Sequence, residues 1–217
     1  MKNELGDSSP LSGKIMNLVK AIYEKVETLH DYLSAAEAME ILRRYMVMNS
    51  FDGALTMLGF IMGSYAAGGR DPHIILSAGI SASLAMGLSG FIGALITEKA
   101  EREKKVKELE KALFADLRGS YIDKAARITV ISAAIVDALA PAVAALISAL
   151  PLVFTLYGLI SFDLAVALSI TLTLAFIFML GFYLGKVSGG QPWKYGLYML
   201  AAGFILSLIS NSIGFMR

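Results

Sequence analysis

Charged residues gather in two short parts of this chain, and this distribution constrains its fold more than any other feature. Of the 37 Asp, Glu, Lys and Arg residues, 13 lie in residues 1–44 and 16 in residues 98–127, so the other 143 hold only eight. A helix that crosses the ~30 Å hydrocarbon core of a bilayer needs about 20 mostly apolar residues. The sequence therefore predicts an all-α, multi-pass membrane protein that resides in the lipid bilayer of the cell membrane.

Five segments have the length and composition of transmembrane helices. They are Tyr45 to Ala67, His73 to Thr97, Ile128 to about Thr155, about Asp163 to Leu184, and Trp193 to Phe215. The third and fourth share one apolar run that is too long for a single helix, and the residues able to break it are Pro151, Gly158 and Ser161. We expect a membrane domain over residues 45–217, with a charged helical insert at 98–127 and an N-terminal arm over 1–44.

The number of Lys and Arg residues is alternately high and low in successive segments outside the spans. The arm has six and the insert nine, whereas the first loop has only Arg70. Because cytoplasmic loops retain positive charge, the arm and the insert are predicted to be cytoplasmic and the C-terminus outside. The arm also has an apolar stripe at helical spacing, which predicts an amphipathic helix lying on the membrane or on a partner subunit, with a regulatory role as the alternative. The stripe consists of Ile15, Leu18, Ile22, Val26, Leu29 and Leu33.

Composition also excludes several classes of function. The chain has no Cys and a net charge of +1, and its lysines alternate with glutamates, so we expect no thiol chemistry and no nucleic-acid partner. No phosphate-binding GxxxxGK[ST] loop, GxSxG elbow or HExxH metal motif is present. An ATP-driven pump or a membrane protease lacks its machinery here, and the sequence predicts that the protein is not an enzyme.

The first span carries an acid, Asp52, which costs ~2.5–3.5 kcal/mol at the centre of a membrane helix and is therefore a functional candidate. Steps of three and four place it on one polar and small face with Tyr45, Asn49, Thr56, Gly59 and Gly63. Two interpretations fit this face. It lines a hydrated cation path in which Asp52 is an oxygen ligand or proton acceptor, or it is a buried packing stripe in which Asp52 is protonated and hydrogen-bonded to Asn49 or another neighbour.

Two further residues inside spans could belong to the same path. Met86, on a face of small residues in the second span, offers a thioether to a transition metal or simply fills space between helices. Asp137, one turn before Pro141 in the third span, is either a second relay carboxylate or a cap for backbone groups that the proline frees.

Acidic residues of the charged insert are candidates for collecting a divalent cation at the mouth of such a path. Glu98, Glu101 and Glu108 offer carboxylate oxygens. The alternative is a solvated helix, because Glu98 is four residues from Arg102 and Glu101 four from Lys105, the spacing of favourable ion pairs.

The order of these motifs resembles the vacuolar iron transporter family. The resemblance lies in Arg44, Asn49-Ser-Phe-Asp52-Gly53-Ala-Leu-Thr56, Gly59 and Gly63 of the first span, and in Ser83-Leu-Ala-Met86-Gly87 before a charged helix. It implies a homodimer that exports ferrous iron or manganese in exchange for protons, with Asp52 and Met86 on a path at the dimer interface. The cation is then a substrate, and no cofactor is permanently bound. The chain departs from the family at Gly90-Phe91, where the family has a carboxylate, and in its shorter insert.

These observations predict a secondary divalent-cation transporter. The alternative is a dimeric scaffold that transports nothing and whose cytoplasmic helices dock a partner, and a channel is a third possibility. Small residues on the first two spans predict that these spans meet across a two-fold dimer interface. The residues concerned are Gly59, Gly63, Gly79, Ser83, Gly87, Gly90 and Gly93.

Overall fold

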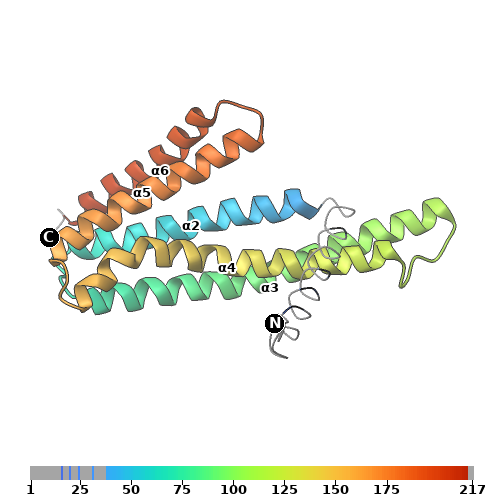
Figure 1. The fold of residues 1–217 in the computed structure, drawn as a ribbon, viewed down its shortest axis with the longest axis horizontal. Coiled ribbons are helices and arrows are strands. Elements are labelled where there is room, and N and C mark those ends of the chain that lie inside the picture. Colours follow the sequence, from blue (N-terminus) through green and yellow to red (C-terminus); the bar gives the residue numbers. More distant parts are fainter. Residues whose placement is uncertain (1–15, 17–19, 21–23, 25–30, 32–37, 215–217) are drawn as a thin grey trace, which may run out of the picture.

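The computed structural model describes residues 38–214, together with single positions 16, 20, 24 and 31. Within these residues it has five α-helices and no strand (Figure 1). They are α2 (Ala38–Ala66), α3 (Pro72–Leu113), α4 (Tyr121–Leu156), α5 (Phe162–Val187) and α6 (Pro192–Gly214). All five are long and apolar enough to cross a membrane, so the prediction of an all-α, multi-pass protein is confirmed. The predicted apolar stripe of the arm lies outside the described residues.

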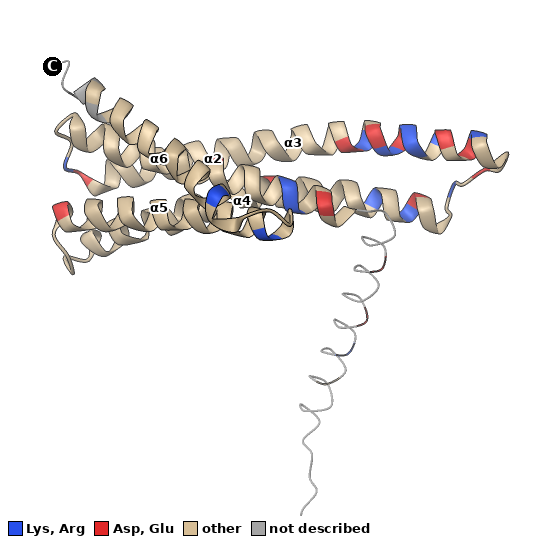
Figure 2. Cartoon of the chain, turned by 90° about the horizontal axis from the view of Figure 1, so that it is seen from above, with Lys and Arg blue, Asp and Glu red and all other residues tan. Residues whose placement is uncertain are grey.

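The charged insert is a continuation of two membrane helices. α3 runs on past Thr97 to Leu113, and α4 begins at Tyr121, well before the apolar residues of its span. Ser120 caps α4 by accepting a hydrogen bond from the Asp123 N–H at 3.3 Å. Residues 98–127 thus form one helical hairpin, the charged hairpin, which projects beyond the apolar bundle (Figure 2).

The boundary between the third and fourth spans lies at Gly158 and Ser161. Gly158 has a φ of 69°, in the left-handed region that favours glycine, and Ser161 is the N-cap residue of α5. Pro151, the other predicted breaker, stays inside α4, as does Pro141. A proline removes one backbone hydrogen bond, and a helix packed among neighbours tolerates that loss. Pro151 is buried next to Leu152 of the core, where such packing holds the helix together.

The core is formed where α4 packs between the other helices. Glycines allow two of these contacts, because a Cβ on Gly53 would overlap the Pro141 backbone and one on Gly87 would lie 2.5 Å from the Ala138 carbonyl oxygen. α2 and α3 therefore both approach α4 at backbone distance. The α5–α6 pair leans away from these three helices toward its own turn (Figure 1).

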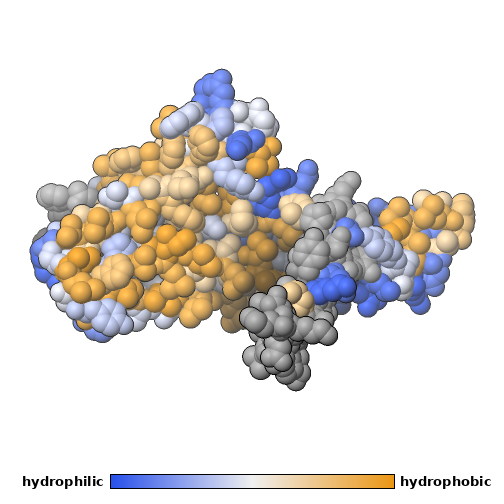
Figure 3. All heavy atoms as spheres, viewed as in Figure 1, coloured by the Kyte–Doolittle hydropathy of each residue, from blue (hydrophilic) through white to orange (hydrophobic). Residues whose placement is uncertain are grey.

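The face of the bundle that Figure 3 shows is mostly apolar, as is typical of a lipid-facing surface. The exposed side chains of the bundle include Leu84, Leu88, Leu164, Met179 and Leu208. At the end opposite the charged hairpin, Arg70 forms an ion pair of 2.9 Å with Asp163 and joins the α2–α3 loop to the start of α5.

Candidate functional site

Asp52 lies outside the core-facing side of α2, on the face whose Tyr45 and Thr56 side chains contact α3. Its side chain is exposed, whereas the core-facing side of the helix holds a continuous set of buried residues. These are Val47, Ser50, Gly53, Ala54, Met57, Leu58 and Ile61. The protein therefore presents a carboxylate on the outside of an apolar, membrane-length helix.

The neighbours of Asp52 on this face have separate partners. The Asn49 side chain donates a hydrogen bond to the Tyr45 carbonyl at 2.9 Å, within its own helix. The Thr56 hydroxyl donates to the Met86 sulfur at 3.5 Å and so joins α2 to α3. The structure thus brings two of the predicted path residues, Thr56 and Met86, into direct contact one turn from Asp52.

Asp137 reaches the same region from α4. Its side chain is only 6% exposed, and it faces Gly90 of α3, whose added Cβ would lie 3.0 Å from the carboxyl carbon. Asp137 lies one turn before Pro141, whose backbone contacts Gly53 next to Asp52, so α2 and α4 carry the two acids at neighbouring levels of the bundle. No hydrogen bond or ion pair joins the Asp137 carboxylate to any residue in the part of the chain that the structure describes. The predicted bond from this side chain to backbone freed by Pro141 is therefore not seen there.

Glu98 of α3 takes part in a buried polar contact with Tyr45 of α2. It is 6% exposed, lies 3.9 Å from Arg102, and accepts a hydrogen bond from the Tyr45 hydroxyl at 3.1 Å. The predicted ion pair with Arg102 is present, and Glu98 is turned inward. It lies on the side of Asp52 nearer the charged hairpin.

The other two predicted collecting residues point to solvent. Glu101 is exposed, and Glu108 is exposed with Lys104 at 4.0 Å. Among the described residues, no three His, Asp or Glu side chains lie close enough together to hold a metal ion. The structure therefore does not gather Glu98, Glu101 and Glu108 into one site within the protomer.

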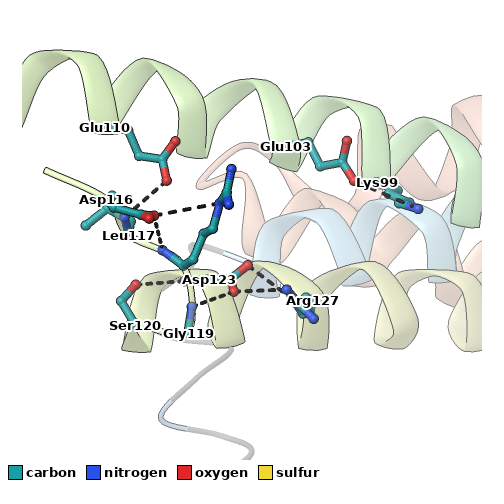
Figure 4. Close-up of polar contacts among 10 residues, drawn as sticks. Lys99, Glu103, Glu110, Asp116, Leu117, Gly119, Ser120, Asp123 and Arg127 are labelled. Carbon is teal, nitrogen blue, oxygen red and sulfur yellow. Dashed lines mark hydrogen bonds and ion pairs between the residues drawn. The ribbon is translucent and has the colours of Figure 1, made fainter.

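At the tip of the charged hairpin, carboxylates hold the turn between α3 and α4 (Figure 4). Glu110 accepts a hydrogen bond from the Leu117 N–H at 3.1 Å, and Asp123 accepts one from the Gly119 N–H at 3.0 Å. The Gly119 N–H, followed by Arg127, lowers the pKa of Asp123 below its usual value. These acids have a structural role in the turn.

Most small residues of α3 pack inside the protomer, contrary to the predicted dimer interface. A Cβ on Gly79 would overlap Met57, and Gly87 lies against Ala138. Ser83 is buried and Gly90 faces Asp137. These small residues allow the helices of one chain to pack closely against each other. The small residues with open or nearly open space are Gly59, Gly63 and Gly93.

Comparison with known proteins identifies one relative and no matching family model. The uncharacterized protein MJ0645 of Methanocaldococcus jannaschii is 32% identical over 171 residues, which cover 76% of this chain and 85% of that protein. The chain belongs to the MJ0645 family. Since MJ0645 is uncharacterized, the function is argued from the site.

Two features of the site in this MJ0645-family chain could not be read from the sequence. Tyr45 marked the start of a polar face, but its bond to Glu98 joins residues 53 positions apart. Gly90 counted as one small residue among several, and nothing in its surroundings in the sequence indicates the Asp137 carboxyl opposite it. The sequence did indicate one contact near this site, because the four-residue spacing of Glu98 and Arg102 predicts their ion pair.

Proposed function

We propose that this protein is a secondary transporter of divalent metal cations, with ferrous iron or manganese as the substrate and protons as the exchanged ion. The observation that carries the proposal is the exposed Asp52 carboxylate on an apolar, membrane-length helix. Such a side chain costs several kcal/mol in hydrocarbon, so acids at this depth generally line an ion path.

The path runs along α2 from the charged hairpin inward. A cation passes Glu98 and Tyr45, meets Asp52 and Asp137, and then reaches Thr56 and Met86. Carboxylate oxygens suit Mn²⁺, and a thioether adds affinity for softer ions such as Fe²⁺. The exposed Glu101 and Glu108 raise the local cation concentration at the mouth.

A second copy of the chain completes the path by covering the exposed face of α2. Among the described residues, no other helix lies within 4 Å of a Cβ built on Gly63, and Asp52 needs shielding from lipid. A two-fold homodimer that joins these faces satisfies both requirements. The excess of Lys and Arg in the arm and the charged hairpin supports a cytoplasmic position for both. The proposed direction, export, comes from the resemblance to the vacuolar iron transporter family.

The decisive experiment is uptake of Mn²⁺ and Fe²⁺ into proteoliposomes under a proton gradient. Asp52→Asn should abolish the flux while the protein still inserts and folds. Asp163→Asn is the matched control, because this exposed carboxylate pairs with Arg70 at the far end of the bundle. Flux of wild-type rate in the Asp52→Asn protein would refute the assignment.

The projecting charged hairpin favours a second candidate, a dimeric scaffold that docks a cytoplasmic partner (Figure 2). A scaffold and a transporter differ in the same assay. If the protein is a scaffold, the wild-type protein moves no cation under any gradient. Removal of the exposed charges of the charged hairpin would then weaken only the binding of the partner.

A further inference from the structure

We infer that Asp137 is the second anionic ligand of the cation held at Asp52, and that Gly90 is the residue whose missing side chain admits the Asp137 carboxylate. This inference rests on the proposed transport function and deepens it. It assigns one dicarboxylate site, built from α2 and α4 with α3 as its wall, to a divalent cation.

The first argument is the state of the Asp137 side chain. A buried carboxylate without a partner is costly, and buried polar groups are nearly always paired. Among the buried hydroxyls, those of Ser83, Thr129 and Ser148 each donate to the carbonyl four residues earlier, whereas those of Thr155 and Ser169 have no partner in the described part of the chain. An ionised carboxylate in such a position costs far more than a hydroxyl. The Asp137 carboxylate, 6% exposed, has no hydrogen bond or ion pair to any described residue, so it lacks the partner that a cation would supply.

The second argument is the fit between Asp137 and Gly90. A Cβ at position 90 would lie 3.0 Å from the carboxyl carbon and 3.1 and 3.2 Å from the two oxygens, closer than ordinary side-chain contacts. Any other residue would push the carboxylate away. Gly93, one turn further along α3, has nothing within 4 Å and creates no such space.

The third argument is charge. Gly53, next to Asp52, contacts the backbone of Pro141, one turn from Asp137, so the two acids lie on helices in direct contact. In an apolar setting two neighbouring carboxylates hold such positions best when a cation lies between them. One divalent ion neutralises both. Two carboxylates with coordinated water are a ligand set that Mn²⁺ accepts, and one charge from each of two helices favours divalent over monovalent ions.

The competing role, a cap for the helix at Pro141, fails on chemistry. Proline lacks an N–H, so the group it leaves without a partner is the carbonyl of Asp137 itself. An ionised carboxylate only accepts hydrogen bonds and cannot satisfy another acceptor. A protonated one could donate to this carbonyl, but no such hydrogen bond from the Asp137 side chain is present among the described residues.

The test measures Mn²⁺ binding to the full-length protein in detergent, from the EPR signal of the free ion, and Mn²⁺ flux in proteoliposomes. Asp137→Asn and Gly90→Ala should each weaken Mn²⁺ binding by about tenfold or more, the range seen when a metal site loses support. Gly93→Ala, the same substitution on the same helix, should bind as wild type does.

A double variant separates this role from a general packing defect. If Gly90 acts by placing Asp137, then Gly90→Ala adds nothing once Asp137 is already Asn. Additive losses in Gly90→Ala/Asp137→Asn would overturn the positioning role. Should Asp137→Asn fail to fold, Gly90→Ala and Asp137→Glu carry the same test.

The outcomes also distinguish this inference from the transport proposal. Wild-type Mn²⁺ binding in both Asp137→Asn and Gly90→Ala, with flux lost only in Asp52→Asn, would refute the dicarboxylate site and leave the transporter intact. A wild-type protein that neither binds nor moves Mn²⁺ or Fe²⁺ would refute both.

Discussion

Single residues of the charged hairpin differ in role although the sequence groups them together. Glu98, Glu101 and Glu108 share one acidic helix, yet Glu98 is buried between Arg102 and Tyr45 while the other two face solvent. Spacing along a helix indicates which side chains can pair. It does not indicate which of them a neighbouring helix covers, and here Tyr45 of α2 decides that.

Glu98→Gln should destabilise the protein far more than Glu101→Gln. Removal of one partner of a buried ion pair costs about 3–5 kcal/mol, whereas an exposed substitution changes stability by less than about 0.5 kcal/mol. Thermal unfolding in detergent, followed by circular dichroism, measures both. Equal melting temperatures for the two variants would contradict the buried arrangement of Glu98.

Tyr45→Phe tests the contact between α2 and α3 without a change of charge. It removes a hydrogen bond to a charged group, worth about 1.5–3 kcal/mol, and leaves the Glu98–Arg102 pair in place. We expect a melting temperature between those of wild type and Glu98→Gln. A Tyr45→Phe protein as stable as wild type would show that this bond contributes nothing.

At the scale of elements, the sequence was informative about helices and uninformative about their ends and contacts. Apolar length located all five helices, but it marks where lipid contact stops, not where a helix stops. Apart from Val106, the residues from Glu98 to Leu113 are Glu, Lys, Ala, Arg and Leu, which are strong helix formers, so α3 continues to Leu113. Pro151 was read as a breaker because local rules take no account of the packing that holds α4 together around it.

The contact between α2 and α4 depends on Gly53. A Cβ there would overlap the Pro141 backbone, so Gly53→Ala should push the two helices apart and destabilise the protein by about 1–3 kcal/mol. Gly63→Ala is the matched control in the same helix, since nothing lies near its Cβ position and alanine favours the helix. Unfolding of both variants in the same detergent gives the comparison, and equal stability would show that α2 and α4 are not packed at backbone distance.

For the whole molecule, the sequence located the polar face of α2 correctly but not the partners of the small residues on α3. Gly79, Ser83, Gly87 and Gly90 looked equivalent to Gly59 and Gly63, because a sequence does not say whether a small face meets its own chain or another. In the protomer, these α3 residues pack against other helices of the same chain. Among the described small residues, Gly63 on the α2 face that carries Asp52 has open space beside it, and the proposed second copy is placed on this face.

Assembly through this face gives the last prediction. Gly63→Leu should disrupt a dimer and Mn²⁺ flux together while the protomer keeps its fold, because the space beside a Cβ at position 63 is open among the described residues. The chain has no cysteine, so single cysteines at Gly59 or Gly63 report cross-links between copies without background. A cysteine at Met179, exposed on α5, is the control. If the α5 cysteine cross-links between subunits and those on α2 never do, then Asp52 faces lipid in the assembly and the proposed path is wrong.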